Sequence, residues 1–186
     1  MRDQFESPLI KRYASKEMSF IFSPQYKFQT WRKLWIYLAE SEMELGLPIT
    51  QEQVDELKAH EKDINFEVAE EEEKRRRHDV MSHIRALGEL CPAAAPIVHL
   101  GATSCYVTDN TELIQMREGL KVLRKKLLKL IEQLASFCDE YKNMPMLGFT
   151  HFQPAQLTTV GKRFSLYLQD LYLDFERIDA EISRIP

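Results

Sequence analysis

Polar and ionisable side chains gather in four short segments of this sequence, and these could carry chemistry. They are "KRY" at residues 11–13, "RRRHDVMSH" at 75–83, "HLGATSCYVTDN" at 99–110 and "GFTHFQPAQLTTVGKR" at 148–163. Each stands at the boundary of a predicted helix, where side chains and free backbone N–H groups can face a ligand. The four segments are therefore the candidates for a functional site.

The segment at 148–163 sets a Thr-His pair before two amides that flank a proline. Pro154 restricts Gln153 to extended geometry, and we expect Pro154 to begin the next helix near its first turn. His151, preceded by Thr150, would then be held at the entrance of that helix. A histidine there can donate a proton at neutral pH, or it can simply hydrogen-bond the loop, and these residues leave both interpretations open.

The segment at 75–83 places a histidine between residues of opposite charge. Arg77 can hold an anion with two hydrogen bonds, and Asp79 can orient His78 or cap the next helix. The alternative is a plain helix junction with an exposed histidine. His83 follows His78 by five positions, so the two rings fall on different sides of a helix, unlike the i, i+4 pair of a zinc motif. We therefore expect no metal site.

The segment at 99–110 combines a glycine with two hydroxyl side chains. Gly101 lets the backbone approach a ligand closely, and Thr103 and Ser104 add hydroxyl donors just before a helix N-terminus. Such a place suits a carboxylate or a phosphate. The alternative, which these residues leave open, is a turn followed by a helix cap.

Apolar spacing predicts that helices position these segments. A stripe at intervals of three, four and seven predicts a helix that Gly46 ends, and its side chains should lie in a core. Thr50 and Gln53 form a capping-box pattern before a shorter helix. Four glutamates at 70–73 precede basic residues at 74–77 by four positions, which favours ion pairs on a solvated helix face. The stripe consists of Phe28, Trp31, Trp35, Leu38 and Leu45.

Two long apolar seams predict two long helices in the rest of the chain. Asp109 with Glu112 offers a helix cap, and seams with alternating spacings of three and four follow over 113–141 and 164–185. We expect two antiparallel or nearly antiparallel members of a bundle, and no period-two pattern predicts a strand. Two helices leave apolar sides uncovered, so further helices should come from partner subunits or from a longer parent protein.

The predicted fold is therefore all-α, with an N-terminal helical domain over 1–108 and the start of a central long-helix bundle over 109–186. The chain's 25 basic and 29 acidic residues are mixed along its length, which excludes the broad cationic surface that nucleic acid needs. Its three cysteines are widely spaced and lack CxxC spacing, as is typical of reduced thiols. Neither a signal peptide nor a membrane helix is recognisable, so we expect no membrane partner and a cytoplasmic protein.

Taken together, the four segments resemble the N-terminal part of the adenylosuccinate lyases, a branch of the aspartase/fumarase superfamily, and most closely the animal-type enzymes. The resemblance runs from "SPLIKRY" through "RHDVMSH" and "HLGATSCYVTDN" to "GFTHFQPAQLTTVGKR". Related lyases for fumarate, aspartate and argininosuccinate share a Thr-His loop, but "RHDV" and "QPAQLTTVGKR" point to the adenylosuccinate branch. The fold that this resemblance implies is a fumarase/aspartase-type helical bundle.

The resemblance implies β-elimination of fumarate from adenylosuccinate and from the succinyl-carboxamide ribotide of purine biosynthesis, without a cofactor. It implies a general acid at His151 and a substrate-contacting, acid-supporting histidine at His78, with Lys162 and His99 near the site. The substrate-binding residues that it implies are Arg12 and Tyr13 for the nucleotide phosphate, Thr103 and Ser104 for the succinyl carboxylates, and Arg77, Asp79, Thr150 and Gln153 around the two histidines.

One part of the family's pattern is missing from this sequence. The family's base is a serine on a mobile Ser- and Gly-rich loop that ends in a Met-Pro-x-Lys-x-Asn pattern, and "NMPMLG" at 143–148 has neither the serine run nor the lysine. The family's site is also assembled from three subunits of a homotetramer. We therefore expect an N-terminal portion that is inactive alone. The alternatives are a non-catalytic helical oligomerisation or regulatory module derived from this family, or an argininosuccinate-type lyase.

Overall fold

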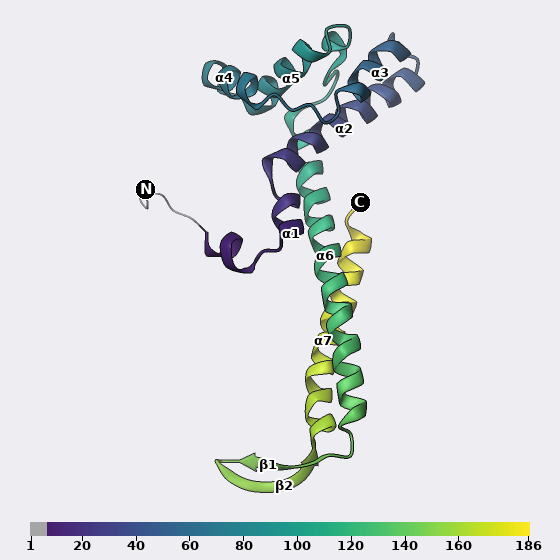
Figure 1. Cartoon of the computed structure of the whole chain (residues 1–186). Helices are drawn as coiled ribbons and strands as arrows, with labels where there is room; N and C mark the ends of the chain where they lie inside the picture. Colours follow the sequence, from purple (N-terminus) through teal and green to yellow (C-terminus); the bar gives the residue numbers. More distant parts are fainter. Residues whose placement is uncertain (1–6) are drawn as a thin grey trace, which may run out of the picture. The chain divides into compact units, whose positions relative to one another are not determined.

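The computed structural model describes residues 7–186, which form two compact units that divide between Gln115 and Met116 (Figure 1). Helices form nearly all of the regular structure, which confirms the predicted all-α class apart from one small hairpin. Helix α6, Ser104–Glu140, runs without a break through residues 108 and 109, where we placed the domain boundary, and that division stays a prediction. Within the described residues, no helix has both the length and the apolarity to cross a membrane.

The first unit is built from the helices that precede the long helix α6 and from the start of α6 itself. Their order along the chain is a π-helical turn η1 (Leu9–Tyr13), α1 (Lys16–Ile21), α2 (Pro24–Glu44), α3 (Gln51–Ala59), α4 (Phe66–Arg76), α5 (Asp79–Leu90) and a 3₁₀ turn η2 (Ala95–Ile97).

Local capping residues explain where these helices begin and end. Ser23 caps α2 by accepting a hydrogen bond from the backbone of Tyr26, and Pro24 occupies the first helical position. After α2 ends, Gly46 adopts a left-handed φ of 88°, which glycine tolerates best. The predicted capping box of α3 is confirmed, because the side chains of Thr50 and Gln53 bond each other's backbone N–H groups.

The core of the first unit lies between α2, α3, α5 and the start of α6. Trp31 and Trp35 are 0% and 1% exposed, which confirms that the aromatic stripe of α2 enters a core. Leu45, which we predicted to extend the stripe, is 81% exposed, because it lies beyond the last helical residue of α2. The buried cluster includes Trp31, Trp35, Ile36, Ala39, Val54, Leu57, Val80, Leu87 and Val107.

Helix α4 carries ion pairs on a solvated face, one of them with the predicted i, i+4 spacing. Glu72 bonds Arg76 at 2.7 Å with the expected i, i+4 spacing, and it also bonds Arg75 at 2.7 Å with i, i+3 spacing. The two guanidinium groups lower the pKa of Glu72 to about 2. Exposed pairs of this kind contribute little to stability, so α4 depends on its packing.

The second unit contains an antiparallel pair formed by the part of α6 that follows Gln115 and by α7, Val160–Arg184 (Figure 1). Phe137 packs against Phe164 at 4.9 Å between ring centroids, while Arg124 bonds Asp179 at 2.7 Å. The partners of earlier α6 residues thus lie later in α7, which confirms the antiparallel prediction. The predicted start of α6 at Asp109 is wrong: the helix begins at Ser104, and Asp109 accepts a hydrogen bond from the hydroxyl of Thr108.

A two-stranded hairpin joins α6 to α7, although we predicted no strand. Strands β1 (Pro145–Thr150) and β2 (Gln153–Thr159) pair antiparallel, and Pro154 lies within β2. The prediction that Pro154 begins a helix is therefore wrong, because α7 starts at Val160 after the capping residue Thr159. A proline is tolerated here because each strand of a two-stranded sheet is an edge strand. Neither strand contains a buried residue, so the hairpin lacks the buried face that marks a half-buried strand.

Candidate functional site

Two helix N-termini meet at His78 and Ser104 in the first unit. His78 caps α5, and its Nδ1 accepts a hydrogen bond from the backbone N–H of Met81 at 3.4 Å. Its Nε2 lies 3.4 Å from the Oγ of Ser104, the first residue of α6. Because Nδ1 acts as the acceptor, the ring proton belongs on Nε2, facing the hydroxyl. The positive ends of two helix dipoles thus lie beside an imidazole and a hydroxyl, an arrangement that favours an anionic ligand.

Arg77 and Asp79 flank this histidine at the junction of α4 and α5. Arg77 ends α4 with a left-handed φ of 56°, and its backbone N–H donates to the carbonyl of Glu73. The Arg77 side chain is exposed and has no ion-pair partner within residues 7–186. Asp79 accepts a hydrogen bond from the backbone of Val80 at 2.8 Å and lies 3.8 Å from Nδ1 of His78. The cap of α5 is therefore His78 itself, and Arg77 is free to bind an anion.

The "HLGATS" segment forms a turn immediately before α6. The backbone N–H of Ala102 donates to the carbonyl of His99, and both His99 and Gly101 have left-handed φ values, of 65° and 64°. Thr103 is exposed and precedes the helix. The indole N–H of Trp35 donates to Nδ1 of His99 at 3.0 Å. A turn thus lies directly before the helix, which starts at Ser104 and not at the predicted Asp109.

The turn η1 carries Arg12 and Tyr13 on an exposed segment. Tyr13 is 73% exposed, and neither side chain makes a hydrogen bond or ion pair with the part of the chain that the structure describes. The structure therefore does not join these two residues to the His78–Ser104 pair.

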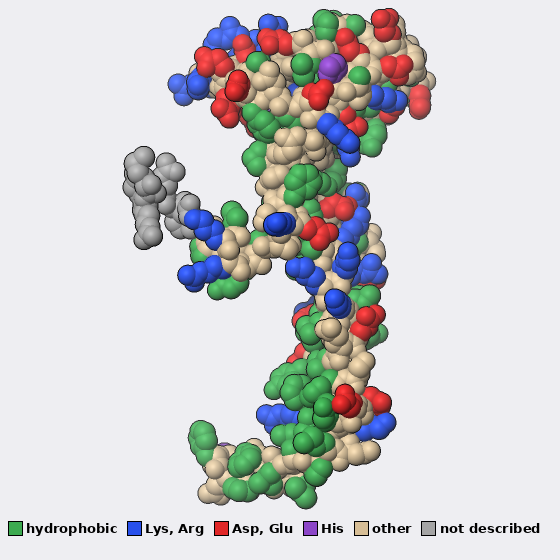
Figure 2. Space-filling model, in the orientation of Figure 1, with side chains coloured by type: hydrophobic (Ala, Val, Ile, Leu, Met, Phe, Trp, Pro, Cys, Tyr) green, Lys and Arg blue, Asp and Glu red, His purple; other side chains and the backbone are tan. Residues whose placement is uncertain are grey.

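The tip of the β1–β2 hairpin brings together the other predicted site residues. Thr150 and Gln153 are partners in the strand register, and His151 and Phe152 form the two-residue turn between them. Both turn residues have left-handed φ values, of 48° and 59°, as a type I′ turn requires. His151 is thus exposed at a hairpin tip, and our expectation of a helix entrance is wrong. Figure 2 shows that apolar side chains gather over this end of the second unit, and they include Leu147, Phe149, Phe152 and Leu157.

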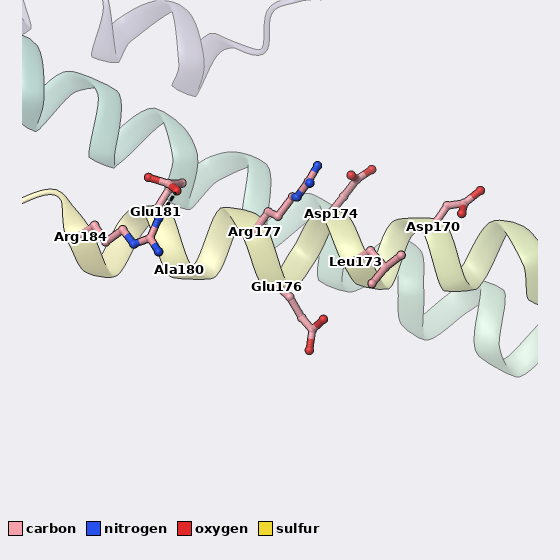
Figure 3. Close-up of a pocket in the computed structure, with 8 residues that line it drawn as sticks. All are labelled: Asp170, Leu173, Asp174, Glu176, Arg177, Ala180, Glu181 and Arg184. Carbon is pink, nitrogen blue, oxygen red and sulfur yellow. Dashed lines mark hydrogen bonds and ion pairs between the residues drawn. The ribbon is translucent and has the colours of Figure 1, made fainter.

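Helix α7 carries a groove of about 720 Å³ that contains none of the predicted site residues (Figure 3). Its lining comes from α7 alone, and the Glu181–Arg184 pair at 2.9 Å neutralises part of its charge. It is therefore an open charged helix face. Nowhere in the described residues are three histidine, cysteine or acidic side chains close enough together to hold a metal ion.

Residues 15–185 match the model of a protein family described as Lyase. The chain therefore belongs to this lyase family. Among its relatives, the adenylosuccinate lyase of Saccharomyces cerevisiae is 50% identical over 186 residues, which cover 97% of this chain and 39% of the relative. The adenylosuccinate lyase of Schizosaccharomyces pombe is 53% identical and covers 91% of this chain and 36% of its own length. That of Schistosoma mansoni is 47% identical, over 95% of this chain and 37% of the relative.

The resemblance that the four segments predicted is thus confirmed. The chain spans about two fifths of the length of the curated relatives that it matches. Solved structures agree on the fold: a fumarate lyase from Mesorhizobium sp. BNC1 superposes with a TM-score of 0.80 at 21% identity, over 90% of this chain and 40% of that one. A 3-carboxy-cis,cis-muconate lactonizing enzyme from Pseudomonas putida gives 0.84 at 23% identity, over 97% of this chain and 42% of that one.

Proposed function

We propose that this chain forms part of an adenylosuccinate lyase, which eliminates fumarate from adenylosuccinate and from the succinyl-carboxamide ribotide of purine biosynthesis. The observation that carries the proposal is the meeting of His78 and Ser104 at two helix N-termini, in a chain whose relatives at 47–53% identity are named adenylosuccinate lyases. Both segments belong to the motifs that carry the resemblance.

The elimination requires a base beside the carbon that loses a proton and an acid beside the nitrogen that leaves. A base removes a proton from the carbon next to a carboxylate, the new C=C bond of fumarate forms, and the electrons of the C–N bond pass to nitrogen. An acid then protonates that nitrogen. In our proposal His151 is this acid and His78 supports it, since histidine can exchange protons near neutral pH. The base would be the serine of the Ser- and Gly-rich loop, and this sequence of 186 residues does not contain that loop.

The substrate carries a phosphate and two succinyl carboxylates, so its binding needs several donors. We assign the phosphate to Arg12 and Tyr13, whose side chains are exposed and unpaired within the described residues. Thr103 and Ser104 would donate to the succinyl carboxylates at the start of α6, where the helix dipole also favours negative charge. The same donors would stabilise the charge that develops on the carboxylate as the proton leaves.

The remaining predicted residues would position the two histidines. Asp79 lies beside His78, and Arg77 can add a bidentate contact to a substrate anion. Thr150 and Gln153 close the hairpin turn that presents His151. In this proposal the enzyme needs no cofactor, works in the cytoplasm and assembles as a homotetramer whose subunits share each active site.

A chimaera tests the proposal directly. The 186 residues would replace the matched region of the Saccharomyces cerevisiae adenylosuccinate lyase, and the loss of adenylosuccinate absorbance would be followed. We expect activity in the chimaera, none with His151→Ala, and a raised KM with Arg12→Ala; an argininosuccinate-type lyase would be indifferent to the loss of this phosphate contact. If the folded chimaera neither turns over adenylosuccinate nor binds adenylosuccinate or AMP in calorimetry, the proposed function is wrong.

A further inference from the structure

The hydrogen bond between Trp35 and His99 determines which atom of His99 carries the proton. Trp35 lies on α2 and is 1% exposed, and its Nε1 is 3.0 Å from Nδ1 of His99. The two ring planes meet at 82°, so the edge of the indole faces the imidazole. An indole N–H can only donate a hydrogen bond. Nδ1 of His99 must therefore be the acceptor, and the ring proton must be on Nε2.

The same contact opposes a second proton on the ring. A charged imidazole would need a hydrogen on Nδ1, directed at the indole N–H, and this would break the bond. Partial burial of His99 lowers its pKa, and the nearby His78 lowers it further. His99 is thereby held as a neutral ring of one tautomer.

The other ring nitrogen of His99 is available to a ligand. His99 is only partly buried, and its Nε2 has no hydrogen-bond partner within residues 7–186. The backbone of His99 has a left-handed φ of 65°, which costs energy, and the turn bond from Ala102 helps to maintain it. The hydroxyl of Tyr106 donates to the carbonyl of Leu34, so α2 anchors both sides of this turn through neighbouring residues.

We propose that Trp35 is a positioning residue that locks His99 as a neutral Nε2–H hydrogen-bond donor, directed at an oxygen of the bound substrate. This inference rests on the proposed lyase function for the identity of the substrate. In this role His99 polarises or holds its acceptor and transfers no proton, because the neutral ring has no free basic nitrogen. The proton transfers of the elimination then belong to other groups.

Nuclear magnetic resonance of this chain tests the lock without any assay of activity. We expect His99 to show a protonated Nε2 and an unprotonated Nδ1 at neutral pH. Trp35→Phe should shift the tautomer ratio by about fivefold, as the loss of one typical hydrogen bond predicts. Trp31→Phe is the matched control, because Trp31 is equally buried in the same stripe but its Nε1 has no partner. A proton on Nδ1 in the wild type, or equal shifts in both variants, would overturn the proposal; the wild-type spectrum decides it even where a variant fails to fold.

The chimaeric enzyme provides a second test, which separates donation from proton transfer. His99→Gln keeps an N–H donor at the end of a side chain, whereas His99→Leu does not. We expect His99→Gln to retain at least tenfold more kcat/KM than His99→Leu and to leave the shape of the pH profile unchanged. Equal losses of kcat/KM in the two variants would refute the donor role. So would the disappearance of one of the two pH-dependent slopes from the pH profile of His99→Gln. If the chimaera has no lyase activity at all, the proposed function is wrong. The magnetic resonance experiment still tests whether Trp35 fixes the tautomer of His99.

Discussion

Acidification should destabilise the first unit through one buried histidine, His83. Its side chain is 5% exposed, stacks on Phe28 at 3.7 Å between ring centroids and meets the edge of Trp31 at 5.5 Å. Burial, aided by the charge of Arg32, lowers the pKa of His83 from 6.5 to about 4. Between these two values the unfolded chain binds a proton that the folded chain excludes, so stability falls as the pH falls through this window. Above the pKa of the unfolded chain the ring is neutral in both states, so the protein has its full stability there.

The size of this effect follows from the two pKa values. The loss reaches about 3 kcal/mol at the acid limit and about 2 kcal/mol near pH 5. Urea unfolding can be followed by tryptophan fluorescence, since Trp31 and Trp35 are the chain's two tryptophans and both lie in this core. The difference in unfolding free energy between wild type and His83→Gln should change by about 2 kcal/mol between about pH 7 and about pH 5.

A matched control is His60→Gln, which removes a histidine from the surface, where it pairs with Asp63. A change of pH dependence that His60→Gln shares with His83→Gln could not be assigned to the buried ring of His83. If wild type and His83→Gln lose stability in parallel on acidification, then the ring of His83 is not held neutral and the reasoning from burial is refuted.

Two further predictions concern the helices. Thr50→Ala removes the capping box of α3 and should cost about 1 kcal/mol in urea unfolding, while Thr50→Ser should restore most of it. In Gly161→Ala, the new Cβ would lie 2.3 Å from the backbone oxygen of Cys138, so the α6–α7 pair should lose about 1–3 kcal/mol. The loss should be seen in far-UV circular dichroism, with tryptophan fluorescence less affected; Gly88→Ala, with 3.2 Å to a side chain, is the control. An unchanged Gly161→Ala protein would contradict the close packing.

Much of the fold was predictable because short-range chemistry determines it. The capping box of Thr50 and Gln53 and the stop at Gly46 each depend on residues within a few positions of one another. The apolar seams likewise predicted the antiparallel α6–α7 pair, since spacing along one helix decides which face is apolar. These features need no knowledge of distant parts of the chain.

The hairpin escaped prediction because its signals are weak in the sequence. Type I′ turns usually contain asparagine, aspartate or glycine, whereas this one contains His151 and Phe152 at left-handed φ values. Such conformations cost energy in residues other than glycine, and they persist where the surroundings or a function maintain them. The exposed strands also bury no alternating face. The departure from local rules therefore coincides with the residue that we propose as the acid.

The candidate site shows the same division between local and distant information. Sequence motifs identified the polar helix ends, but they could not reveal that His78 meets Ser104 across 26 positions or that Trp35 meets His99 across 64. The apolar spacing correctly placed Trp35 in the core. The spacing does not reveal that the N–H group of Trp35 donates to His99. A buried tryptophan must place its single donor somewhere, so the search for that acceptor is the step by which a core residue can be connected to a functional one.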